Sequence, residues 1–198
     1  RIAVNTVAIY CRLVLSSGIA LFSTRYVLEA LGEEDFGLYN VIAGVVALFS
    51  FIASTMATTT QRFISFTMGS APDTGRIREV FGSSLCLHVV VAFVVAAVVL
   101  LGGWLLIDNV LSIPQGKHSD ALFVLVSVCF GLVGTIVSVP FEALLMAHEN
   151  IVFVSVCQMF NTLVKLGGAL LLLYLEADRL RIYAVITSSH RHTILGNA

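Results

Sequence analysis

Two cations lie inside stretches that are otherwise apolar, and they are the strongest candidates for chemistry in this sequence. Arg12 lies eleven residues after the first residue, and Lys165 lies fifteen residues after Asn150. If helices begin at those points, a rise of 1.5 Å per residue puts Arg12 ~16 Å and Lys165 ~22 Å along them. Glu142 is the only acid in these stretches, at ~9 Å before the turn at His148. We therefore expect two costly charges near the middle of a membrane with no acid at their level.

Polar residues repeat along the helical faces that carry these cations, at spacings of three, four or seven residues. The three stripes are Asn5, Arg12, Ser16 and Ser23; Ser155, Gln158, Thr162 and Lys165; and Ser54, Thr58 and Gln61 with Arg62 beside them. Such stripes face either other helices, through hydrogen bonds, or a hydrated cavity. The candidates for lining a substrate cavity are Arg12, Gln61, Arg62, Gln158 and Lys165.

The composition indicates whether these stretches lie in water or in a lipid bilayer. Of 198 residues, 58% are hydrophobic and only 12% are charged, whereas soluble domains carry about 25% charged residues. The mean hydropathy is +0.98. These values exclude an ordinary soluble globule, a disordered tail and a secreted disulfide scaffold. The net charge of −1 gives no electrostatic footprint for nucleic acid.

Roughly 20 apolar residues cross a bilayer as a helix, and the sequence holds five such stretches and part of a sixth. They cover about residues 2–24, 37–60, 80–107, 121–147, 151–175 and 182–186. The polar residues from Thr187 onward predict that the sixth stretch stops there, and residues 187–198 form an atypical tail. The fold class is an all-α, polytopic transmembrane bundle. The basic residues of the connections divide evenly, and their clustering favours a cytoplasmic N-terminus.

Other residues inside the stretches have structural interpretations. Pro140 predicts a helix bend. His88 is interpreted as a packing or hydrogen-bonding residue, with a proton relay as the alternative. Glycine pairs predict close helix packing, namely Gly102-Gly103, Gly131-x-x-Gly134 and Gly167-Gly168. Four cysteines, one in each of four stretches, are interpreted as small buried apolar residues: Cys11, Cys86, Cys129 and Cys157.

Motifs for catalysis, metal binding or cofactor binding are absent from the sequence, which has no HExxH, GxSxG, Walker loop or Cys/His ligand spacing. The connections are too short for a soluble catalytic domain. We therefore expect no enzyme activity, no metal and no cofactor.

Several motifs resemble those of a known transporter family. The run Asn5-Thr6-x-x-x-Tyr10-x-Arg12 is followed by Thr24-Arg25-x-x-Leu28 and Leu31-Gly32-x-x-Asp35-Phe36-Gly37-Leu38-Tyr39-Asn40-Val41. The order continues with Thr60-Gln61-Arg62-Phe63, Val139-Pro140-Phe141, Ala147-His148-Glu149 and Leu180-x-Ile182-Tyr183-Ala184. Over residues 1–186 the chain resembles the N-terminal part of Wzx-type polysaccharide flippases. These O-antigen and lipopolysaccharide exporters belong to the MATE-like (MOP) superfamily.

The resemblance implies two lobes of about six helices that rock around a central cavity in a bacterial inner membrane. The implied cargo is a polyprenyl-diphosphate-linked oligosaccharide, and midplane cations suit such an anion. Expected partners are the bilayer, a missing C-terminal lobe and other polysaccharide-assembly membrane proteins. A truncation or frameshift would explain the tail. Two alternatives stay open: a drug or cation-coupled exporter, which needs a carboxylate in the cavity, and a small accessory membrane assembly protein.

Overall fold

The computed structural model describes residues 2–70, 74–111, 113, 116–148, 151–174 and 179–189. Its regular secondary structure is entirely helical, which confirms the predicted all-α class. The helices are α1 (Ile2–Leu48), α2 (Ser50–Ser70), α3 (Thr74–Asn109), α4 (His118–Ala147), α5 (Ile151–Tyr174) and α6 (Arg179–Ser189). Residues 190–198 of the predicted tail, and Glu149 of one flippase-like motif, lie outside the described residues.

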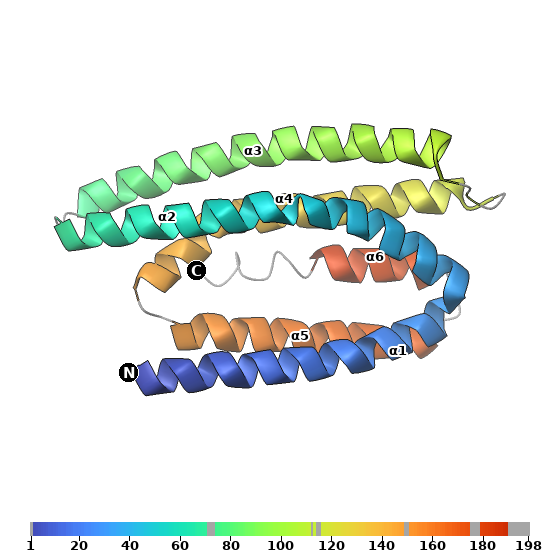
Figure 1. Cartoon of the computed structure of the whole chain (residues 1–198), viewed down its shortest axis with the longest axis horizontal. Helices are drawn as coiled ribbons and strands as arrows, with labels where there is room; N and C mark the ends of the chain where they lie inside the picture. The colour runs from blue at the N-terminus through green and yellow to red at the C-terminus, as the bar shows by residue number, and fades with distance from the viewer. Residues whose placement is uncertain are drawn as a thin grey trace.

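Gly32 reverses the direction of α1. Its φ of 77° and ψ of 168° interrupt the helical backbone, and a positive φ is a conformation that glycine adopts at little steric cost. Figure 1 shows α1 running along the lower side of the molecule and returning above, toward α2. The reversal falls inside the acidic connection from Glu29 to Asp35. One continuous helical stretch therefore supplies two of the predicted spans.

The helices form two layers with a short helix between them (Figure 1). α2, α3, α4 and the second half of α1 lie in the upper layer. The first half of α1 packs along α5 in the lower layer, and α6 contacts α1, α4 and α5. The lower layer therefore brings together the two helices, α1 and α5, that carry the predicted stripes of Arg12 and Lys165.

Within the described part of the chain, four helical stretches are long and apolar enough to cross a membrane: Ile9–Ser70, Gly75–Asn109, His118–Ala147 and Val152–Leu171. The first has 62 residues, or ~93 Å of helix, and Gly32 divides it into two passes. α3 has 36 residues, so it extends beyond the predicted span 80–107 at both ends. Large apolar side chains on the outer surface, such as Phe22, Phe66 and Phe93, are exposed. The chain is thus a multi-pass bundle of membrane-spanning helices.

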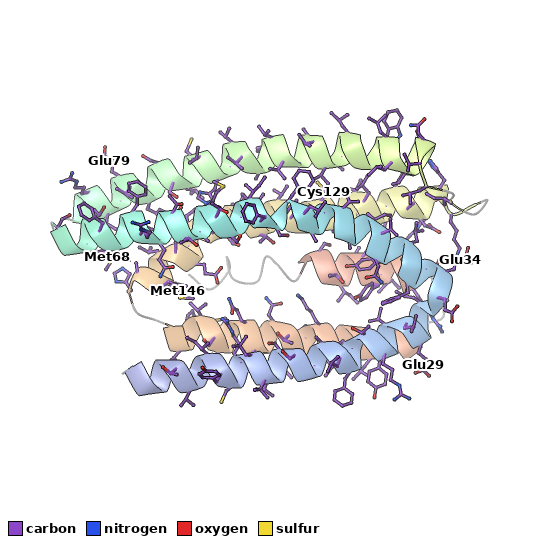
Figure 2. All side chains as sticks on the ribbon, in the orientation of Figure 1. Glu29, Glu34, Met68, Glu79, Cys129 and Met146 are labelled. Atoms are coloured by element: carbon purple, nitrogen blue, oxygen red, sulfur yellow. The ribbon has the colours of Figure 1, made fainter. Side chains whose placement is uncertain are left out.

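α4 is the most buried helix and forms the centre of the core. Val124, Leu132 and Ile136 on α4 have no exposed surface. Figure 2 shows Cys129 in the upper layer and Met146 lower down, where the end of α4 approaches the start of α5. Pro140 lies between them inside α4, and proline removes one backbone hydrogen bond of a helix. α4 therefore leaves the upper layer over the stretch in which the sequence predicted a bend.

α6 is longer than the predicted stub 182–186, because it continues to Ser189. The hydroxyl of Thr187 donates to the carbonyl of Tyr183 over 2.8 Å, and that of Ser188 donates to Val185 over 2.9 Å. These bonds let polar residues stay in a helix without partners on other helices. Ser188 is buried against Gly131 of α4, where a Cβ would lie 3.0 Å from the Ser188 Cα. The predicted end at residue 186 is wrong for this reason.

Two of the packing predictions hold only in part. In the pairs 102–103 and 167–168, the second glycine meets a neighbouring helix, whereas a Cβ added at Gly102 or Gly167 would have nothing within 4 Å. Cys129 is buried, but Cys11 and Cys86 are exposed. The prediction of buried cysteines is wrong for these two, because their helix faces point outward from the bundle.

Candidate functional site

Arg12 on α1, Gln158 on α5 and Glu142 on α4 form one hydrogen-bonded series, which we call the relay. Arg12 Nη1 donates to Gln158 Oε1, and Gln158 Nε2 donates to Glu142 Oε1 over 2.8 Å. All three residues are half-buried. Arg12 is therefore linked to Glu142 through an amide, a connection that the sequence did not predict.

The depth calculation missed the relay because it compared acids and cations without the side chain between them. Along straight helices Glu142 lies at ~9 Å, Gln158 at ~12 Å and Arg12 at ~16 Å from one side of the bundle. Each step is short enough for one long side chain to cross. The end of α4 also turns toward α5 (Figure 2). Gln158 was predicted as a site residue, whereas Glu142 was not.

The two neighbours of Gln158 determine the orientation of its amide. A guanidinium only donates hydrogen bonds, and a carboxylate only accepts them. The carbonyl end of the amide must therefore face Arg12, and its NH₂ end must face Glu142. The reverse orientation would oppose donors to donors and acceptors to acceptors.

Lys165 lines a cavity of about 420 Å³ between the layers. Its walls come from both halves of α1, from α5 and from α6. Polar lining residues are Ser16, Ser23, Thr24, Asn40, Thr162, Lys165, Tyr183 and Thr187. None of the described lining residues is acidic. The cavity therefore offers one cation, hydroxyls and an amide, which suits a polar or anionic ligand.

The relay adjoins this cavity along two helices. Ser16 follows Arg12 by four residues on α1, and Thr162 follows Gln158 by four residues on α5. Residues four apart lie one above the other on the same helical face. The stripes of α1 and α5 thus face each other, a pairing that the sequence left open, with the relay about one turn from the cavity lining. The side chain of Asn5, the first member of the α1 stripe, lies outside the described part.

Gln61 and Arg62 lie apart from this cavity. Both are exposed on α2 and line a different pocket with Thr58, Thr59 and Ser65. The hydroxyls of Ser54 and Thr58 donate to carbonyls of their own helix. The α2 stripe therefore needs no partner helix, and the five predicted site residues divide between two places.

His88 of α3 is buried. Its Nδ1 lies 2.7 Å from the carbonyl of Ser84, and the Ser84 hydroxyl lies 3.3 Å from that of Thr60. This geometry confirms the interpretation of His88 as a hydrogen-bonding residue. It also supplies a contact between helices of the kind expected for hydroxyl residues in membranes.

Sequence reasoning missed a set of ion pairs at one end of the bundle. Lys117 pairs with Asp35 and, at 3.5 Å, with Glu34. Arg181 Nη2 lies 2.6 Å from Asp120 Oδ1. The hydrogen bond to Asp35 is the main cause that raises the pKa of Lys117. Opposite charges in the predicted connections were the available signal, but which connections meet depends on the reversal at Gly32.

Two further contacts belong to this cluster. His118 Nε2 lies 2.6 Å from Asp108 Oδ1, and Arg179 Nη1 donates to the carbonyl of Ala30 over 3.0 Å. The cluster joins the reversal of α1, the connection between α3 and α4, and the start of α6. Its partly exposed charges and distance from the relay favour a structural role.

Comparisons with protein-family models, with curated proteins and with solved structures found no match to this chain. The resemblance to polysaccharide flippases therefore stays a prediction that rests on the motifs quoted above. What the structure establishes is a multi-pass helical bundle with a polar, cation-bearing interior.

Proposed function

We propose that this chain is the N-terminal lobe of a membrane transporter that flips a lipid-linked oligosaccharide across a bacterial inner membrane. The cargo carries its negative charge on a diphosphate, and its sugars need hydroxyl and amide partners. The observation that supports this proposal is the cavity lined by Lys165, which is polar, contains no acidic residue among its described lining, and adjoins Arg12. The resemblance of the motifs points to the same cargo.

The chemistry of this proposal is binding and displacement rather than reaction. Lys165 would hold anionic oxygens of the diphosphate as a point charge, and Arg12 would hold them with its planar fork. Ser16, Thr162 and Asn40 would bond sugar hydroxyls. The apolar outer surface would leave the polyprenyl chain in the lipid. A second lobe, by the same resemblance, would supply the opposite wall of the cavity.

The test measures binding of a polyprenyl-diphosphate-linked oligosaccharide to the purified chain in lipid nanodiscs. A charge-assisted hydrogen bond contributes ~1.5–3 kcal/mol, so Arg12→Leu and Lys165→Leu should each raise Kd by ~10- to 150-fold. Arg25→Leu is the matched control, because Arg25 is an exposed α1 cation outside the described cavity lining. No binding, or equal losses in all three variants, would contradict the proposal.

A drug or cation-coupled exporter is the second candidate, favoured by one observation. Glu142 is hydrogen-bonded inside the bundle as part of the relay, rather than lying near the membrane surface. Such an exporter would bind a lipophilic cation such as ethidium, and Glu142→Gln would abolish that binding. The charge of the bound ligand therefore decides between the two candidates, and an accessory assembly protein would bind neither.

A further inference from the structure

We infer that Gln158 is a spacer that offsets the charge of Arg12 with Glu142 while leaving the guanidinium available to an anion. The inference rests on the proposed function, since it concerns how the same site binds its ligand. Its basis is the relay, in which a neutral amide stands between a cation and a carboxylate. This adds Glu142 to the site as a positioning residue and assigns Gln158 a role in affinity.

The charges of Arg12 and Glu142 offset each other within the relay. Arg12 and Glu142 carry opposite charges inside spanning segments, where an isolated charge is strongly disfavoured. Together with the amide they form a neutral unit. Each charged group has at least one hydrogen bond to Gln158, so the protein can keep both charges in the bundle before any ligand arrives.

An anion that binds Arg12 must displace the group that is already bonded to the guanidinium. A direct Arg–carboxylate pair is short, often bidentate and strong. In that arrangement an incoming phosphate would exchange one anion for another and gain little. In the relay, the phosphate displaces only a neutral amide oxygen from Arg12. The exchange then replaces a weaker acceptor with a stronger, charged one.

One hydrogen bond of the relay remains after an anion has displaced the amide from Arg12. Gln158 Nε2 still donates to Glu142, so the displaced amide and the carboxylate keep each other as partners. Lys165 lies seven residues beyond Gln158 on α5, or ~10 Å along the helix. A ligand with two anionic groups, such as a diphosphate, is therefore the smallest that would engage both cations. Inorganic pyrophosphate is the simplest probe of this class.

The experiment exchanges the acidic side chain of Glu142 with the amide side chain of Gln158, without changing the composition or the net charge. In the variant Gln158→Glu/Glu142→Gln, the carboxylate contacts Arg12 directly. Pyrophosphate binding to the full chain in nanodiscs is measured by calorimetry, with thermal unfolding as the check on folding. We expect a folded protein whose Kd is at least about tenfold higher, because the anion must now displace a carboxylate. A Kd within twofold of the wild type would overturn the inference.

The single variant Glu142→Gln keeps the inference testable if the exchanged protein does not fold. It removes the nearby negative charge but retains an amide partner for Gln158. We expect Kd to fall by about threefold or more, since a like charge no longer opposes the ligand. Glu29→Gln is the matched control, because the exposed Glu29 lies at the end of the bundle opposite to Met146 (Figure 2) and should leave Kd unchanged. Unchanged or weaker binding in Glu142→Gln overturns the inference.

Three further outcomes separate this inference from the proposed function. If the wild-type chain does not bind pyrophosphate, Arg12 is not an anion-binding group and the inference fails. If pyrophosphate binds with the expected dependence but the lipid-linked oligosaccharide does not, the relay stands and the proposed cargo is wrong. If the oligosaccharide binds through Arg12 but the exchange has no effect, only the spacer role of Gln158 is wrong.

Discussion

The two ends of the bundle differ in how their basic and acidic side chains contact each other. At the turn end, defined by Gly32, the connection between α3 and α4, and the start of α6, basic side chains pair directly with carboxylates. Toward the N-terminal end, where α1 and α5 begin, Arg12 is separated from Glu142 by an amide. Figure 2 shows Glu34 at the turn end and Met146 at the other. Direct ion pairs join the loops at the turn end. The amide of Gln158 instead leaves Arg12 able to exchange its partner for an anion.

The difference also has an energetic side. Ion pairs with partly exposed partners contribute little, typically below ~1 kcal/mol. The same charges inside a membrane segment are expensive if they lose their partners. We therefore expect substitutions at the turn end to change stability slightly and ligand binding not at all. Substitutions in the relay should change both.

The largest expected effect comes from separating α6 from α4. Gly131→Leu would drive a side chain into the backbone of Ser188, and overpacking of this kind destabilises by ~1–3 kcal/mol or more. The ion pair of Arg181 would loosen, while the Arg12 contact to Gln158 would persist because α6 takes no part in it. Thermal unfolding measures the loss, with Gly102→Leu as the control in open space. Equal effects of the two variants would show that α6 does not pack on α4.

The next effect concerns the relay and reverses an expectation from the sequence. As an unpaired cation, Arg12 would be neutral or stabilising to remove, because its insertion costs at least ~2.5 kcal/mol. As a member of the relay, Arg12→Leu instead leaves Glu142 without its opposite charge and Gln158 without a donor, and we expect a loss of ~1–3 kcal/mol. Adding Glu142→Gln should restore stability but not anion binding. A double-mutant cycle in unfolding free energy measures this coupling, and strict additivity would argue against the relay.

A smaller effect is expected at Arg181. This side chain donates Nε to Asp120 over 2.8 Å and lies 5.6 Å from the ring centre of Phe123. Arg181→Leu should lower the unfolding free energy by ~1 kcal/mol, the upper range for a partly exposed pair. Ligand Kd should stay the same, which distinguishes the turn end from the relay. Arg181→Lys should recover part of the stability, and a tenfold change in Kd would contradict the comparison.

The smallest effect is expected at Lys117, where pH provides the test. Its folded pKa is raised above the ordinary 10.5 by Asp35 and Glu34. The stabilisation is therefore complete below 10.5 and is lost as pH rises through the folded pKa. Lys117→Met should lower the unfolding free energy by ~0.5 kcal/mol at neutral pH. The difference from the wild type should stay constant from pH 6 to 9 and shrink above 10.5; shrinkage on acidification from pH 8 to 6 would be the wrong sign.

The spans themselves were predictable because their signal is local. Long apolar runs separated by acidic or mixed-charge connections predict helices and reversals, and Gly32 lies inside one such connection. The ends were less predictable. α3 continues past its apolar run because backbone hydrogen bonds form regardless of side-chain polarity, and Thr187 and Ser188 bond to carbonyls of their own helix.

Most residues of the site were predictable from the sequence, but the contacts between them were not. Periodicity identified the stripes of α1 and α5, and Ser16, Ser23, Thr162 and Lys165 do line one cavity. Periodicity cannot show which stripes meet, so Gln61 and Arg62 on α2 were grouped with them. Depth along straight helices also could not show that Gln158 bridges to Glu142, since that contact depends on the path of α4 after Pro140.

The central position of α6 has a consequence for how the bundle is made. The described part of α6 has 11 residues, or ~16 Å, and it contacts α1, α4 and α5. It lies between the two layers near the end of the bundle where α1 reverses (Figure 1), and the helices of both layers precede it in the chain. During synthesis the earlier helices therefore leave the ribosome before α6 can pack among them. Completion of the core is then a late step of biogenesis, set by the arrival of α6 rather than by the insertion of any span.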